Sequence, residues 1–111
     1  MNTNQNDPKE VFRVDAFTEH KQGMVTVQGV VENKSDSAAC LKELTALYKN
    51  TDGFVVDVDR MKCEHDLSAG EKFNFQFPWR RVPINCYIFE VMVSKFSKSD
   101  SNSSKGIFLS T

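Results

Sequence analysis

The sequence predicts an all-β protein that folds as an antiparallel sandwich of about seven strands. Stretches of alternating apolar and polar residues recur along the 111 residues, and turn signals separate them at roughly ten-residue intervals. In the clearest stretch, residues 67–78, a Ser-Ala-Gly turn precedes Phe73, Phe75 and Phe77, which alternate with polar residues. A period of two places these rings on one face of a strand, so a second apolar layer must cover them.

Size and charge exclude several classes of protein. A chain of 111 residues suits one domain, and with 40% hydrophobic residues it can build a core without disulfides or a metal. The net charge of -1 argues against nucleic-acid binding, which needs a concentrated basic surface. The chain has no apolar run long enough for a membrane span. The first ten residues do not resemble a secretory signal. Both a cytoplasmic protein and a mature exported domain without its signal fit these observations.

The three cysteines, Cys40, Cys63 and Cys86, are too few for a disulfide scaffold, and their odd number leaves at least one unpaired within the chain. We expect free thiols that pack in the core, where cysteine behaves as a small apolar residue.

The first part of the chain reads as an arm followed by two strands. Residues 1–9 are rich in Asn and are predicted to form a flexible arm. A strand is expected over residues 10–18, a polar turn over residues 19–23 and a second strand over residues 24–33. Gly29 interrupts the apolar face of the second strand and indicates a bulge or a close backbone approach. That face carries Val25, Val27 and Val31.

Residues 38–50 are ambiguous between a helix and a strand. Leu41, Leu44 and Leu47 have helical spacing, the composition favours a helix, and Ser37 could cap it. The alternation of the same residues is also compatible with a strand. Local propensity therefore predicts a short helix within residues 38–49, and the strand remains the alternative.

The second half reads as three further strand regions. Residues 50–53 form a turn, and the strand that follows extends through His65 with a change of phase at Asp59–Arg60, which predicts a bulge or a break there. After the phenylalanine strand comes a loop over residues 79–85.

The last strand is expected over residues 86–96. Residues 97–111 are a low-complexity tail that we predict to be flexible, and they include the apolar triplet Ile107-Phe108-Leu109. The sandwich domain is thus expected to span residues 10–96.

The order of several motifs over residues 23–95 resembles the FxLYD family. The matching segments are Gly29-Val30-Val31-Glu32-Asn33, Leu47-Tyr48, Asp52-Gly53, Val55-Val56, Leu67-Ser68-Ala69-Gly70-Glu71, Phe75, and Phe89, Val91 and Val93 of the last strand. The chain departs from the family at three motif positions, where it has Thr45, Lys49 and Ala69.

The resemblance implies an immunoglobulin-like β-sandwich in which residues 38–50 form a strand. It also implies an exported or envelope-attached bacterial or archaeal protein. No catalytic residues come with the family.

Two groups of side chains could in principle bind a metal. Met61, Cys63 and His65 alternate on a predicted strand, and this set of ligands would suit a soft ion such as Cu(I). We favour core packing for Met61 and Cys63, because metal ligands on sandwiches normally converge from separate loops. The acidic residues Asp52, Asp57, Asp59, Glu64 and Asp66 are expected to form a solvated sheet face rather than a calcium site. No cofactor is predicted.

Trp79, Arg80 and Arg81 are the best candidates for a protein contact, because Trp and Arg are favoured at binding hot spots. The competing interpretation is that Trp79 closes the end of the sandwich. Cys-His catalysis is possible by composition, but no motif marks a nucleophile. We therefore expect a non-catalytic protein-binding module of the cell envelope. The alternative is an assembly subunit that self-associates through residues 1–9 and the triplet at Ile107–Leu109.

Overall fold

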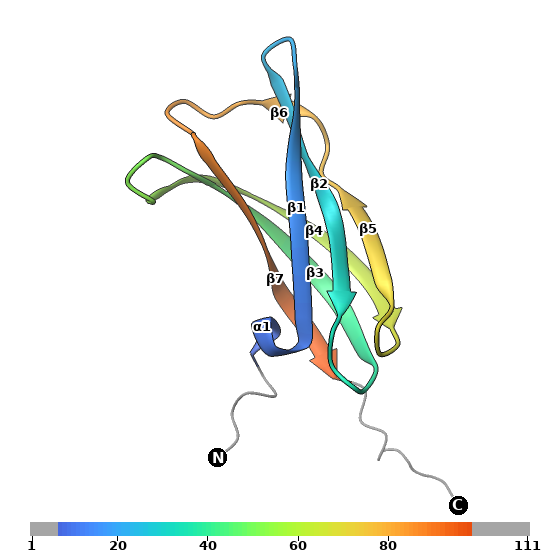
Figure 1. Cartoon of the computed structure of the whole chain (residues 1–111). Coiled ribbons are helices and arrows are strands. Elements are labelled where there is room, and N and C mark those ends of the chain that lie inside the picture. The colour runs from blue at the N-terminus through green and yellow to red at the C-terminus, as the bar shows by residue number, and fades with distance from the viewer. Residues whose placement is uncertain (1–6, 99–111) are drawn as a thin grey trace, which may run out of the picture.

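Two antiparallel sheets packed face to face form the molecule (Figure 1). The computed structural model describes residues 7–98. The first sheet has the strand order β1-β2-β5, with the short β6 also paired to β2, and the second has the order β4-β3-β7. The strands are β1 (Phe12–Lys21), β2 (Met24–Asn33), β3 (Ala39–Lys49), β4 (Val55–Leu67), β5 (Lys72–Gln76), β6 (Arg80–Arg81) and β7 (Ile88–Lys98). The predicted all-β antiparallel sandwich is confirmed.

A single helical turn precedes the first strand. The helix α1 (Pro8–Val11) is capped by the Asp7 side chain, which accepts a hydrogen bond from the Lys9 amide, and it buries Val11. β1 therefore begins later than expected and continues to Lys21, so the predicted turn shrinks to two residues. The predicted flexible segments 1–9 and 97–111 lie largely outside the described residues. Within residues 7–98, no helix is long and apolar enough to cross a membrane.

The prediction of a short helix within residues 38–49 is wrong. This segment is β3, the central strand of its sheet, with backbone partners in both β4 and β7. The helical spacing has a structural cause. An irregularity in the register between Leu41 and Leu44 shifts the phase, so both leucines are fully buried although they are three residues apart. Hydrogen bonds to two neighbouring strands override the local helix preference.

The expected break at Asp59–Arg60 is also wrong, because the β3–β4 register is continuous there. The pairing register shifts instead toward each end of β4. One shift lies opposite the stretch from Leu41 to Glu43 of β3, and the other lies opposite Tyr48 and Lys49. Glu64 lies in the first of these irregular regions and has a left-handed φ of 44°. β4 is therefore a single strand that bends twice rather than two separate strands.

The core lies between the sheets and includes the predicted phenylalanine row. Phe75 and Phe77 are buried with their rings in edge contact, and Phe73 is half-buried at the margin. Facing residues from both sheets complete the core, among them Val27, Val31, Leu41, Leu44, Ala46, Tyr48, Val91 and Val93. Val25, Val27 and Val31 are all buried, as the alternation in β2 predicted.

Gly29 marks a close approach between two backbones. A Cβ atom at this position would lie 2.0 Å from the carbonyl oxygen of Asp15 on the neighbouring strand. The predicted close approach is therefore confirmed. The alternative, a bulge, is not present, because the β1–β2 register runs unbroken through the pair Ala16 and Gly29.

Candidate functional site

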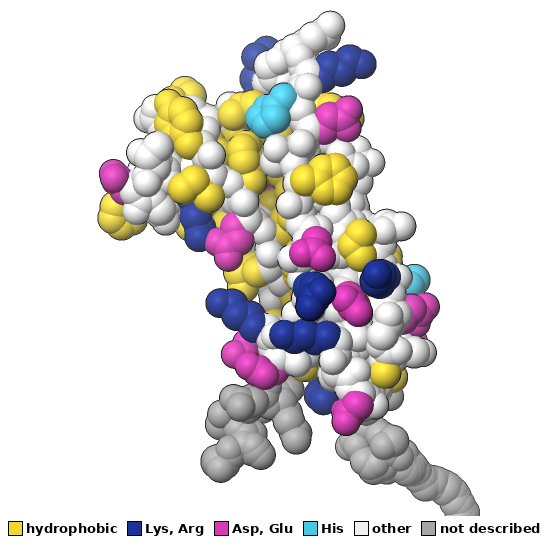
Figure 2. Space-filling view, in the orientation of Figure 1, with side chains coloured by type: hydrophobic (Ala, Val, Ile, Leu, Met, Phe, Trp, Pro, Cys, Tyr) yellow, Lys and Arg dark blue, Asp and Glu magenta, His cyan; other side chains and the backbone are white. Residues whose placement is uncertain are grey.

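A group of large apolar side chains is exposed at one end of the sandwich. Of the nine large hydrophobic residues that are exposed among residues 7–98, six belong to two neighbouring segments at this end, and together we call these six residues the apolar end. They are Phe54, Val55 and Val56 of the β3–β4 hairpin, Ile84 and Tyr87 in the loop before β7, and Ile88, the first residue of β7. Figure 2 shows apolar side chains gathered on this end of the visible face.

Backbone pairing brings the two segments of the apolar end together. Lys49 at the end of β3 pairs with Val55 on one side and with Ile88 on the other. The Tyr87 amide donates a hydrogen bond to the Lys49 carbonyl at 2.9 Å. Three adjacent strands therefore hold the two apolar segments on either side of one lysine.

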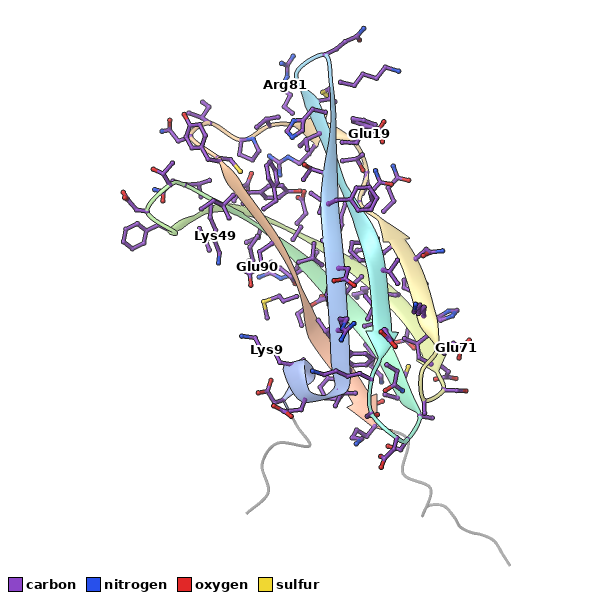
Figure 3. All side chains as sticks on the ribbon, in the orientation of Figure 1. Lys9, Glu19, Lys49, Glu71, Arg81 and Glu90 are labelled. Carbon is purple, nitrogen blue, oxygen red and sulfur yellow. The ribbon has the colours of Figure 1, made fainter. Side chains whose placement is uncertain are left out.

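The turns that carry these side chains are themselves fixed by hydrogen bonds. The Asn50 side chain accepts from the backbone amides of Asp52 and Phe54, each at 3.0 Å. Gly53 supplies the positive φ of 87° that the turn needs. The Lys49 amine forms an ion pair with Glu90, and Figure 3 shows these two side chains on neighbouring strands. The exposed Phe54 ring thus projects from an ordered turn.

The three predicted contact residues are placed differently from one another. Trp79 is 39% exposed and Arg81 is exposed, so both remain available for contact. Arg80 instead points across the sandwich to β4, where its guanidinium donates to Asp57 at 2.8 Å and to Asp59 at 3.2 Å. Arg80 thereby connects the two sheets at the same end of the molecule as the hairpin.

Tyr48 completes this polar connection. Its hydroxyl donates to Asp59 at 2.7 Å, and its ring lies 4.8 Å below the Arg80 guanidinium carbon. Asp57 and Asp59 were expected on a solvated face. They lie between the sheets because their strand partners, Tyr48 and Ala46, are buried core residues. The sequence analysis missed this network. Its signal was the two-residue spacing that places Asp57 and Asp59 on the core-facing side of β4.

Charge pairing shifts the ionisation of the network. The hydrogen bond from Arg80 is the main cause that lowers the pKa of Asp57. Partial burial opposes the charged form of Arg80, but its hydrogen bonds to Asp57 and Asp59 outweigh this and raise the pKa of Arg80. Burial, and then the hydrogen bond to Asp59, raise the pKa of Tyr48. All these shifts favour an ion pair that persists at neutral pH beside a protonated tyrosine.

The candidate soft-metal ligands lie along the edge of the core. Met61 and Cys63 are half-buried and pack against the core, and the His65 ring lies 4.7 Å from that of Phe73. The Cys63 thiol contacts the Met61 carbonyl oxygen at 3.6 Å. Burial raises the pKa of Cys63, which disfavours the thiolate that a metal would need. Among residues 7–98, no three His, Cys, Asp or Glu side chains cluster as a metal site.

The three cysteines are free thiols, as expected. Only Cys86 is fully buried, whereas Cys40 and Cys63 are half-buried. Burial raises the pKa of Cys40, and a hydrogen bond with Asp66 adds to the effect. Both shifted thiols are therefore poor nucleophiles at neutral pH.

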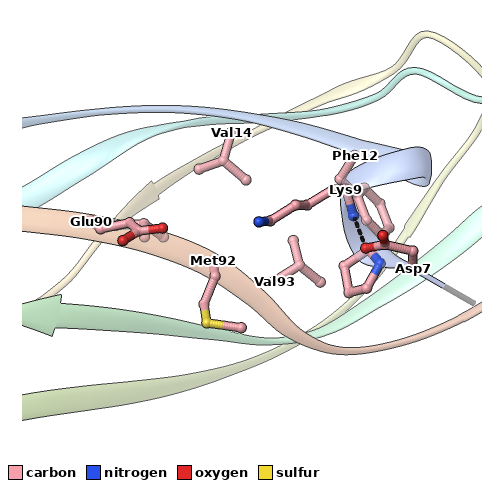
Figure 4. A pocket seen from close by; sticks show the side chains of 9 residues that line it. Asp7, Lys9, Phe12, Val14, Glu90, Met92 and Val93 are labelled. Atoms are coloured by element: carbon pink, nitrogen blue, oxygen red, sulfur yellow. Dashed lines mark hydrogen bonds between the residues drawn. The ribbon is translucent and has the colours of Figure 1, made fainter. Parts of the chain in front are cut away.

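A cavity of about 300 Å³ opens between α1, β1 and β7, and we call it the edge cavity. Its floor includes Phe12, Val14, Val91 and Val93. Figure 4 shows the Lys9 side chain, which extends from α1 into this cavity in the direction of Glu90.

Comparisons of this chain with protein-family models, with curated proteins and with solved structures found no match. The resemblance to the FxLYD family therefore stays a prediction that rests on the motifs alone.

Proposed function

We propose that this protein is a non-catalytic binding module that contacts a protein partner through the apolar end. The observation that carries the proposal is the exposure of Phe54, Tyr87 and Ile84, whose exposed fractions are 69%, 67% and 86%. Exposed apolar side chains that gather in one place mark interaction sites, whereas single ones scattered over a surface do not.

The composition of this surface suits a protein contact. Two aromatic rings and four aliphatic side chains form its centre, and the Lys49–Glu90 ion pair provides a polar neighbour. Interfaces are enriched in aromatic residues at the centre and polar at the rim. Trp79 and Arg81 lie at the same end of the molecule and extend the proposed surface onto the other sheet.

The site gives less support to a catalytic role than to the proposed binding role. The two half-buried thiols have raised pKa values, whereas a nucleophilic cysteine needs a lowered one. The envelope location is part of the proposal and rests on the resemblance to the FxLYD family.

Site-specific photo-crosslinking tests the proposal. A photoreactive phenylalanine analogue at position 84 is expected to crosslink one specific protein in the cells that make this chain. The same analogue at position 17 is the matched control, because Phe17 is 59% exposed but lies on β1, in the other sheet and outside the two segments of the apolar end. Equal crosslinking from both positions would contradict the proposal. Crosslinking of position 84 to a second copy of this chain would support an assembly subunit instead.

Affinity measurements with the identified partner complete the test. The double variant Phe54→Ser, Ile84→Ser is expected to weaken binding by about 100-fold, because hot-spot side chains carry most of the binding energy. Phe17→Ser is expected to leave the dissociation constant unchanged. Isothermal titration calorimetry would measure both, and unchanged binding by the double variant would exclude the apolar end as the contact.

A further inference from the structure

Two unpaired strand edges face each other beside the edge cavity. Among residues 7–98, β1 pairs only with β2, and β7 pairs only with β3, so each leaves one edge free. These two edges belong to different sheets and lie close together along one side of the sandwich (Figure 1). Figure 2 shows apolar side chains in the hollow between them.

The edge cavity between these strands has the character of an incomplete core. Val14, Val91 and Val93 line it, and all three belong to or pack against the main core cluster. Backbone groups along the free edge of β7 can accept another strand, as sheet edges commonly do. A segment that adds to β7 would place alternate side chains into this cavity.

We propose that the apolar triplet Ile107-Phe108-Leu109 of the same chain is this segment, and that it pairs with the free edge of β7 and fills the edge cavity. The triplet lies outside the described residues. Outside residues 7–98, it is the only apolar run, since residues 1–6 and 99–106 together contain a single apolar side chain, Met1. The first six residues are therefore a much poorer occupant.

The connection is long enough for this arrangement. Eight residues, 99–106, separate Lys98, where β7 ends, from Ile107, and the nine steps from Lys98 to Ile107 can span up to about 30 Å. Val93 lies five residues back from Lys98 along β7, which corresponds to about 17 Å. The chain can therefore reverse direction after β7 and bring the triplet beside the cavity as an antiparallel neighbour.

The composition of the connecting residues is compatible with this arrangement. Residues 99–106 carry six Ser, Asp and Asn side chains and one Gly, a composition typical of a solvent-exposed connection between two strands. The triplet follows this connection directly, as a strand follows a hairpin loop.

Nuclear magnetic resonance of the full chain provides the first test. We expect nuclear Overhauser effects between the ring protons of Phe108 and the methyl groups of Val91 and Val93. We also expect slow hydrogen exchange at those β7 amides that point away from β3. If the Phe108 ring shows no contact with either valine, the proposal is overturned.

A pair of variants provides the second test. Phe108→Asp is expected to accelerate exchange at the outward β7 amides by about tenfold or more, because a buried ring is replaced by a charge. Ser104→Asp is the matched control, with the same added charge in the same segment, and it should leave these amides unchanged. Exchange in β3 and β4 reports whether each variant stays folded.

Two outcomes would overturn the proposal. One is equal exchange at the β7 edge in Phe108→Asp and the unmodified chain. The other is protection that disappears on dilution together with a dimer in analytical ultracentrifugation, because the occupant would then come from a second copy.

Discussion

At the scale of single residues, Gly29 shows the strongest steric requirement among the glycines of residues 7–98. Its missing side chain lets the β1 backbone approach so closely that an added Cβ would overlap the Asp15 carbonyl oxygen. The atom in the way belongs to the backbone of a paired strand, so it cannot rotate aside as a side chain would. Gly29 is therefore needed for space rather than for an unusual φ angle.

We predict that Gly29→Ala lowers the free energy of unfolding by about 3 kcal/mol, because the two strands must separate to admit the methyl group. Gly23→Ala is the comparison. Gly23 has open space around it but a φ of +79°, so its replacement should cost only about 1 kcal/mol. Urea denaturation measures both values. A smaller loss for Gly29→Ala than for Gly23→Ala would contradict the steric explanation.

The carboxyl group of Asp57 gives the protein a defined response to acid. Arg80 lowers the pKa of Asp57 in the folded state, below the value of about 3.9 for an unfolded chain. The carboxylate therefore stabilises the fold at pH values above the unfolded pKa, and this contribution is lost as the pH falls through the folded pKa. Because Asp57 is partly exposed, the contribution is screened by solvent.

We predict that Asp57→Asn flattens the pH dependence of stability below about pH 4. Urea denaturation between neutral pH and about pH 2 would measure the slope. Asp52→Asn removes the same charge from the exposed β3–β4 turn and serves as the control. If Asp57→Asn loses stability on acidification as steeply as the unmodified chain, the ion pair with Arg80 is not the source of the response.

Some residue positions could be predicted from the sequence and others could not. The faces of β2 and β5 were predictable, because regular alternation assigns Val27 and Phe75 to the core without further information. The direction of Arg80 was not predictable, because it depends on acids more than 20 residues earlier that only the packing of two sheets brings near. Sequence composition marked Trp79 and its neighbours but missed the exposed rings of Phe54 and Tyr87.

At the scale of elements, β3 and β4 show how irregular register hides a strand. Leu41 and Leu44 both face the core only because the phase of alternation changes between them. This produces the three-residue spacing that is otherwise typical of a helix. Backbone pairing with two neighbouring strands decides between helix and strand here, and one of these neighbours, β7, lies far away in the sequence. The pairing register of β4 shifts in this irregular region and again near the first residues of the strand, and not at Asp59–Arg60, where the sequence pattern indicated a change.

The irregular region of β4 leads to a prediction about Glu64. Its φ of 44° costs free energy for a residue with a side chain, and glycine adopts this angle freely. Glu64→Gly is therefore expected to raise the free energy of unfolding by about 0.5 kcal/mol despite the added freedom of the unfolded chain. Lys62→Gly, in the regular part of the same strand, should lower it by about 1 kcal/mol. Thermal denaturation would distinguish the two variants. If both destabilise the protein, the positive φ angle of Glu64 is not a source of strain.

At the scale of the whole molecule, polar groups connect the two sheets at both ends. Near the apolar end, Arg80 of one sheet holds Asp57 and Asp59 of the other. At the opposite end, the buried Asn33 side chain donates to the carbonyl oxygens of Ser37 and Leu67, each at 2.9 Å. The apolar core between these connections provides most of the stability, and the polar groups fix how the sheets are aligned.

We predict that Arg80→Met lowers the free energy of unfolding by about 1–2 kcal/mol, because it leaves Asp57 and Asp59 without their shared positive charge. The loss is smaller than for a fully buried pair, because the three side chains are 27–43% exposed. Arg81→Met alters an exposed neighbour and should change stability by less than about 0.5 kcal/mol. Equal effects of the two variants in urea denaturation would show that Arg80 does not connect the sheets.

The Asn33 connection is expected to matter more than the Arg80 connection, because it is fully buried. The Asn33 side chain also accepts from the amide and the hydroxyl of Ser35, so its amide group satisfies backbone groups in a loop and in β4 at once. Asn33→Ala leaves these partners unsatisfied and should cost about 3 kcal/mol. Asn74→Ala, on the exposed face of β5, is the control and should cost less than about 0.5 kcal/mol. A loss for Asn33→Ala below that of Arg80→Met would contradict the ranking by burial.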